Sequence, residues 1–188
     1  MEAGFPSCYE WHELSLLLER PGVPRYYYPG GSQEGGRDGT IVEVKPEQGQ
    51  SWVGVFAFAQ VTYKGVSSVF TTPDPHRLCV VAKGAGYLVR ADDPSAWEPV
   101  AAYPIIDVRA VRVRGILVFA DHTRLCAYGR TGLAWRTKHL TWDDLVITAV
   151  TEDCIEGEFW DVATQSAGTF RVDLATGEHE GGIPASGL

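Results

Sequence analysis

The chain has 188 residues, of which 45% are hydrophobic and 21% are charged. These proportions fit one globular domain over residues 1–188 and exclude a disordered or fibrous chain. Its 24 acidic and 16 basic residues give a formal net charge of −8, which argues against binding to nucleic acid or to an anionic membrane, since both require clustered Lys and Arg. The chain is rich in glycine (21) and proline (11), which favours short strands and turns over long helices.

The cysteines give no metal or disulfide pattern. Cys8, Cys79, Cys126 and Cys154 form no CxxC pair and no cluster with histidines, so we predict reduced thiols and no metal site. No signal peptide is visible at the start of the sequence, and no stretch approaches the ~18 apolar residues of a membrane span. We therefore expect a soluble, cytoplasmic protein that does not contact a membrane.

Residues 8–20 are predicted to form an amphipathic helix. Ser7 and Glu10 have the spacing of a capping box, in which a hydroxyl and a carboxylate each accept a hydrogen bond from a backbone N–H at the helix start. Pro21-Gly22 would end the helix. The apolar residues that recur at helical spacing between these signals are Trp11, Leu14, Leu17 and Leu18.

Residues 29–39 contain one proline and five glycines, which predicts a Gly-rich loop. Over residues 40–178 the sequence then predicts an all-β region, in which short runs with period-two alternation are separated by turn residues. The predicted strands are Thr40–Val44, Trp52–Ala59, Gly65–Thr71, Leu78–Ala82, Tyr87–Ala91, Ile105–Arg114, Ile116–Ala120, Leu125–Gly129, Leu133–Lys138, Val146–Val150, Cys154–Trp160 and Gly168–Leu174. Residues 179–188 are expected to form a flexible tail.

A six-residue pattern occurs twice within the all-β region. Asp74–Cys79 (DPHRLC) reappears 47 residues later as Asp121–Cys126 (DHTRLC). Each copy follows an apolar run and precedes a glycine-containing turn and another strand, and a third, looser copy begins at Val146. A period of about 35–50 residues with three or four short strands per unit is typical of β-propeller blades.

The second copy carries a resemblance to a known family. Residues 116–136 contain a strand, a turn, a second strand, then Thr131-Gly132 and Trp135, and this order resembles one blade of the quinoprotein-type β-propellers. The resemblance implies that Trp135 docks on the adjacent blade. Residues 38–182 would hold about three blades, whereas closed rings have roughly 4–8. The cofactor of that family is therefore not implied, and we predict no cofactor.

These patterns together predict the fold. We expect an all-β protein of about three repeated antiparallel meander sheets, which are propeller-blade-like but not closed into a ring, together with the N-terminal helix. A β-sandwich is the alternative.

Two Asp–His pairs are the catalytic candidates. Asp74 with His76, and Asp121 with His122, fall in the repeated turns, which we expect at the same end of adjacent sheets. An Asp that orients a His is the core of many general-base sites. However, Asp is also a preferred turn residue because its carboxylate bonds the backbone two residues on, and this interpretation makes both pairs structural.

The C-terminal region is strongly acidic. Residues 141–188 hold ten acidic residues and one basic residue, and the spacing of a calcium-binding loop is missing. Glu156 and Glu158 alternate in one predicted strand, so they share a face. The candidates for a ligand or partner surface are Glu152, Asp153, Glu156 and Glu158, together with Trp97 and Trp142, which lie beside turns.

The leading hypothesis is a non-enzymatic binding or protein-interaction module whose acidic C-terminal region meets a basic protein partner. The alternative is a hydrolase that uses the Asp/His turns or the carboxylates of residues 152–161, and it predicts those side chains within about 3–4 Å of one another. A third hypothesis is a helper protein whose N-terminal helix docks on another molecule.

Overall fold

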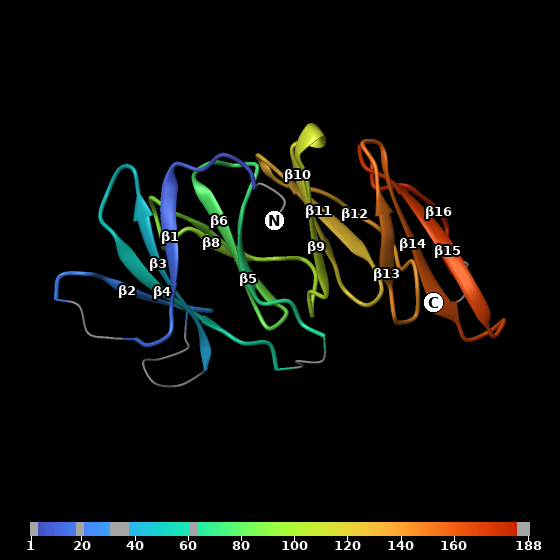
Figure 1. Ribbon diagram of the computed structural model, residues 1–188, viewed down its shortest axis with the longest axis horizontal. Coiled ribbons are helices and arrows are strands. Elements are labelled where there is room, and N and C mark those ends of the chain that lie inside the picture. The colour runs from blue at the N-terminus through green and yellow to red at the C-terminus, as the bar shows by residue number, and fades with distance from the viewer. Residues whose placement is uncertain (1–3, 18–20, 31–37, 61–63, 184–188) are drawn as a thin grey trace.

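The computed structural model of the protein describes residues 4–17, 21–30, 38–60 and 64–183, which form four four-stranded sheets. We name them sheets A to D in chain order. The sheets stand face to face in a row, with A and D at opposite ends (Figure 1). The described residues are therefore all-β and form an open row of four sheets, neither a closed ring nor a two-layer β-sandwich.

Sheet A combines strands that are distant in the sequence. Its spatial order is β1 (Tyr9–Leu14), β3 (Gly39–Pro46), β4 (Trp52–Ala57) and β2 (Arg25–Tyr28). The strand β2 runs parallel to β4, whereas the other pairs are antiparallel. Of the predicted Gly-rich loop, residues 31–37 lie outside the described residues.

The predicted helix over residues 8–20 is wrong. Residues 9–14 form β1 and pair with β3 at six consecutive positions, while residues 18–20 lie outside the described residues. Tyr9 is buried and Trp11 packs against the same core, a spacing of two, whereas Leu16 is exposed. The apolar residues of this segment fit both a helical spacing and the spacing of two of a strand. The strand is favoured because the segment forms backbone hydrogen bonds with β3, which is distant in the sequence. A helper role through a docking helix therefore has no structural basis.

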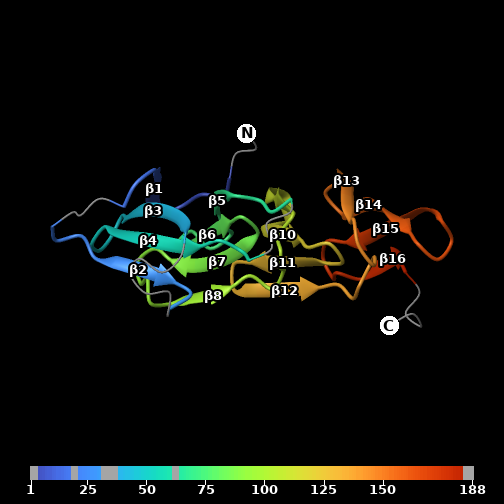
Figure 2. The ribbon, with the colours of Figure 1, turned by 90° about the horizontal axis from the view of Figure 1, so that it is seen from below.

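Sheets B, C and D are antiparallel meanders. Sheet B contains β5 (Ser68–Thr71), β6 (Arg77–Ala82), β7 (Ala85–Arg90) and β8 (Trp97–Pro99). Sheet C contains β9 (Asp107–Val111), β10 (Ile116–Ala120), β11 (Leu125–Gly129) and β12 (Gly132–Arg136), with a short 3₁₀ turn, η1 (Arg112–Arg114), after β9. Sheet D contains β13 (Val146–Val150), β14 (Cys154–Asp161), β15 (Ser166–Asp173) and β16 (His179–Gly181). Figure 2 shows β1, β5 and β13 along one side of the row, and β2, β8, β12 and β16 along the other.

The sheet count and the repeat spacing both differ from expectation. There are four sheets rather than about three, and the expected tail begins with a strand, since residues 179–181 pair with β15. The first strands of sheets B, C and D begin at Ser68, Asp107 and Val146, which are 39 residues apart. The 47-residue repeat instead aligns the second strand of sheet B with the third strand of sheet C.

Three apolar layers hold the row together. Alternate residues of β6 face opposite neighbours: Leu78 and Val80 pack toward sheet A, whereas Cys79 packs toward sheet C. The third layer joins sheets C and D. Strands β6 and β10 are buried along almost their whole length because both of their faces are covered, whereas β14 alternates between buried and exposed residues. One face of sheet D is therefore open.

Aromatic side chains also bond neighbouring sheets to each other. The Trp52 indole N–H donates to the carbonyl of Ala91 at 2.8 Å, so sheet A is bonded to the end of β7. The Trp135 indole N–H donates to the carbonyl of Leu174 at 2.9 Å, which joins β12 to the turn after β15. This contact confirms the docking of Trp135 on the adjacent sheet.

The four cysteines are free thiols. Cys79 and Cys126 are buried between sheets B and C, and burial raises the pKa of Cys126 to about 12 and raises that of Cys79 as well. Both therefore stay protonated near neutral pH. In the described part of the chain, no helix has the length and hydropathy needed to span a membrane.

Candidate functional site

The first Asp–His pair forms a turn before β6. One Asp74 carboxylate oxygen accepts a hydrogen bond from the His76 backbone N–H at 3.1 Å, and the other lies 3.8 Å from the Arg90 guanidinium. The His76 ring is half-exposed, with Nδ1 3.8 Å from the carboxylate of Asp92. Asp74 therefore shapes the backbone and does not orient the imidazole of His76.

The second pair has the same turn chemistry in a more buried setting. One carboxylate oxygen of Asp121 accepts hydrogen bonds from the Thr123 backbone N–H at 2.7 Å, the Thr123 hydroxyl at 2.9 Å and the Arg124 backbone N–H at 2.9 Å. The His122 ring instead has Nδ1 3.1 Å from the carboxylate of Asp143, in the connection to sheet D.

The structure does not bring the two pairs together. Asp74 lies in the first connection of sheet B, and Asp121 lies in the second connection of sheet C. Successive connections of an antiparallel meander lie at opposite ends of the sheet, so the expectation of one shared end is wrong. Among the described residues the two pairs share no hydrogen-bond or ion-pair partner, and no three His, Cys, Asp or Glu side chains gather as a metal site.

The turn role of Asp121 is testable. Asp121→Ala is expected to lower the free energy of unfolding by about 1–3 kcal/mol, because it leaves backbone donors in a buried turn without their acceptor. Asp121→Asn keeps one carbonyl oxygen and should lose less. Urea denaturation measures both, with Glu10→Ala, which removes an exposed carboxylate of β1, as control. Equal stability of Asp121→Ala and Glu10→Ala would contradict the turn role.

The two tryptophan candidates differ in exposure. Trp97 is half-buried, with its ring edge against Tyr28 at a centroid distance of 5.6 Å and a tilted contact to Tyr87. It therefore belongs to the aromatic core between sheets A and B. Trp142 is 45% exposed and precedes Asp143 and Asp144. Its role in binding stays a prediction.

The open face of sheet D holds two of the acidic candidates, Glu156 and Glu158, whereas Glu152 and Asp153 lie in the turn between β13 and β14. We define the acidic face as Glu156, Glu158, Trp160, Arg171 and Glu180, which are all exposed. The three residues of β14 alternate along that strand, and Ile155 and Phe159, on its other face, point into the layer with sheet C. Arg171 lies opposite Glu156 on one side and opposite Glu180 on the other. The face therefore follows from the period-two pattern of its strands.

Trp160 is the large apolar side chain of this face, and it is 54% exposed. It shares the β14 face with Glu158, which has no ion-pair partner among the described residues. The outer face of sheet A, at the opposite end of the row, is less exposed than that of sheet D. Val53 and Val55, which point away from sheet B, are buried. Sheet D therefore presents the Trp160 ring beside the Glu158 carboxylate on its exposed face.

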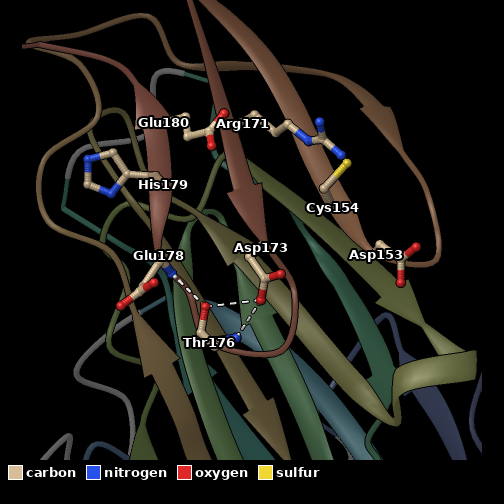
Figure 3. Close-up of a pocket in the computed structure, with 8 residues that line it drawn as sticks. All are labelled: Asp153, Cys154, Arg171, Asp173, Thr176, Glu178, His179 and Glu180. Carbon is tan, nitrogen blue, oxygen red and sulfur yellow. Dashed lines mark hydrogen bonds between the residues drawn. The ribbon is translucent and has the colours of Figure 1, made fainter.

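A hollow of about 470 Å³ adjoins the acidic face. Its lining residues are Asp153, Cys154, Arg171, Asp173, Thr176, Glu178, His179 and Glu180. Figure 3 shows the Arg171 guanidinium beside the Cys154 sulfur, and the side chains of Asp173 and Thr176 joined within the turn before β16. Four carboxylates against one guanidinium give the hollow a negative charge.

Some of these carboxylates already have partners. Hydrogen bonds from the Thr176 backbone and hydroxyl lower the pKa of Asp173, and Asp153 pairs with Arg114, which also donates to the carbonyl of Glu152 at 2.7 Å.

Arg171 lies among groups that keep it charged. The adjacent Cys154 side chain, with the Glu156 and Glu180 carboxylates, raises the pKa of Arg171. Among the described residues, the ion-pair contact of Arg171 is to the Glu156 carboxylate, with Nε 4.0 Å from Oε1. Of the four carboxylates of the hollow, Glu178 and Glu180 have no ion-pair partner within 4.0 Å among the described residues.

The sequence interpretation identified Glu156 and Glu158 but missed Trp160, Arg171 and Glu180. Trp160 has the same parity as the two glutamates in β14, and this signal places it on their face. Glu180 was hidden by the expectation of a flexible tail, and the place of Arg171 depends on the pairing of β15 with both neighbours.

Comparison with known proteins gives one structural likeness. No family model matches the chain, and no curated protein matches it. A solved structure, described as the crystal structure of the N-terminal domain of Nup159, has a TM-score of 0.42 and 11% sequence identity, with 98% of this chain covered. The chain spans about half of that structure's length, 53%.

Proposed function

We propose that the chain is a protein-interaction module whose acidic face binds a basic, arginine-containing segment of a partner protein. The observation that carries this proposal is the exposed Trp160 ring beside the Glu158 carboxylate, on an open sheet face. Among the described residues, this carboxylate has no ion-pair partner and no layer covers the face. A guanidinium stacks on a tryptophan face and forms charge-assisted hydrogen bonds to a carboxylate, so the pair suits one arginine side chain.

The other carboxylates on and beside the acidic face suit further basic residues of the same partner segment. Glu156 and Glu180 flank Arg171, and Glu178 lines the adjoining hollow. Further Lys or Arg residues of the partner would meet these carboxylates. Long-range attraction by the acidic region would also accelerate encounter with a basic partner, an effect that decreases with salt.

A defined probe tests the proposal: a twelve-residue synthetic peptide of alternating arginine and threonine. Its affinity, measured by isothermal titration at physiological salt, is expected to fall at least tenfold in the double variant Glu156→Lys/Glu158→Lys. Trp160→Ala should also weaken binding, because the cation–π contact is lost.

The matched control is Glu10→Lys/Glu47→Lys, which makes the same change in net charge at exposed residues of the sheet A end. It is expected to bind the peptide within about twofold of the wild type, since remote exposed charges are largely screened. Equal weakening in both double variants would show attraction to net charge alone and would overturn the proposal.

A further inference from the structure

The edge strand β13, Val-Ile-Thr-Ala-Val, carries neither a charged residue nor a proline along its length. By contrast, the edge strands β1 and β9 carry charged residues. Val146 is 55% exposed and Val150 is 39% exposed. Natural proteins block exposed edges with charges, proline, β-bulges or coverage. Among the described residues β13 has one of these, a register shift between Ile147 and Ala149, so the regular free edge is its Ala149–Val150 end.

The backbone of β13 also has free hydrogen-bonding groups. The Thr151 N–H donates to the Cys154 carbonyl at 2.9 Å, which makes these two a hydrogen-bonded pair. Such pairs alternate with non-hydrogen-bonded ones in an antiparallel ladder, so the Val150 N–H and C=O, opposite Ile155, point away from β14. Within the described chain, no backbone hydrogen bond outside the ladder with β14 involves residues 146–150.

A groove lies beside this edge. Two adjoining hollows of about 200 and 410 Å³ share Ala110 and Val150, and they separate β9 and η1 from β13. Val111, Val113 and Ile147 add apolar lining, and Val113 is exposed.

The cations of this region differ in pairing. Arg109 binds Asp107 at 2.8 Å and Arg114 binds Asp153, whereas Arg112 is exposed and has no ion-pair partner among the described residues. The groove thus has an apolar floor and an open strand edge, with Arg112 and the exposed Glu152 as the charged residues at its η1 end.

We propose that β13 accepts an extended segment of a partner protein as a fifth strand of sheet D. Main-chain hydrogen bonds would form along the free edge, alternate apolar side chains would lie in the groove, and an acidic side chain would pair with Arg112. This is strand addition, in which the backbone provides affinity and the pockets provide specificity. The site is separate from the acidic face and does not depend on it.

The probe is a random twelve-residue peptide library displayed on phage and selected against the folded wild-type chain. Enriched sequences are expected to alternate apolar residues and to carry Asp or Glu at one end. The best sequence, synthesised as a free peptide, should bind Val150→Lys and Arg112→Glu at least tenfold more weakly than the wild type. The control Val162→Lys changes another exposed valine, in the turn between β14 and β15, and should bind like the wild type, as should Glu156→Lys/Glu158→Lys.

Backbone methylation of the peptide provides a readout that side-chain contact alone would not give. N-methylation of alternate amides on one side of the peptide should abolish binding, whereas methylation of the intervening amides should not. The absence of any enriched sequence, equal binding to Val150→Lys, or equal effects of both methylation patterns would overturn the proposal. A wild-type dimer that Val150→Lys dissociates would also overturn it, because the edge would then hold a second copy of this chain.

Discussion

Replacement of Trp52 by alanine is expected to lower the free energy of unfolding by about 3–5 kcal/mol. The Trp52 side chain is 1% exposed and lies in the layer between sheets A and B, with its ring against the edge of Tyr26 at a centroid distance of 5.7 Å. Its removal creates a cavity in this layer and also leaves the buried Ala91 carbonyl without the indole donor. Guanidinium denaturation measures the loss.

Two companion variants separate packing from hydrogen bonding. Trp52→Phe keeps most of the ring but removes the indole N–H, so it should cost less than Trp52→Ala. Trp142→Ala makes the same change at an exposed tryptophan and should stay within about 0.5 kcal/mol of the wild type. A Trp52→Ala variant as stable as Trp142→Ala would contradict the packing of sheet A on sheet B.

Replacement of Trp135 by alanine is also expected to lower the free energy of unfolding by about 3–5 kcal/mol. The loss of stability should, however, be concentrated in sheet D. Trp135 is buried, belongs to β12 and bonds the Leu174 carbonyl beyond β15. Its ring also abuts Gly177, where an added Cβ would come within 2.9 Å. In a row of units that contact only their neighbours, the loss of one such contact should mainly release the terminal unit.

Hydrogen exchange locates the effect of Trp135→Ala. Amide protection should fall first in β14 and β15, whereas β6 and β7 should keep theirs. The control is Trp160→Ala, which removes an exposed ring from sheet D itself and should leave protection unchanged. A uniform loss of protection in all four sheets would contradict a row held together by pairwise layers.

The strand pattern was largely predictable from the sequence for sheets C and D. The predicted bounds of β10, β11 and β13 match the structure. These strands pair with chain neighbours, so local alternation and turn residues are sufficient to place them. In sheet A, β3 and β4 were predicted, but β1 and β2 were missed. The order of this sheet is not sequential, and Tyr9 and Trp11 fit a helical face as well as a strand.

The candidate site was predictable only in part. Parity along β14 put Glu156 and Glu158 on one face, and the structure adds Trp160 by the same rule. The positions of Arg171 and Glu180 depend on long-range register, which no local pattern specifies. The Asp–His motif was misleading because Asp forms turns wherever a chain reverses, so the similarity of Asp74 and Asp121 reflects turn chemistry.

The most direct test of the interaction proposal follows single residues of the ¹⁵N-labelled protein by NMR during titration with the arginine–threonine peptide. The account predicts saturable shifts of the Trp160 indole N–H and of the Glu158 and Arg171 amides, while the Trp52 indole N–H stays unchanged. Chemical-shift changes confined to residues outside sheet D would contradict the interaction proposal. A Trp160 indole signal that stays unchanged at saturating peptide would contradict it as well.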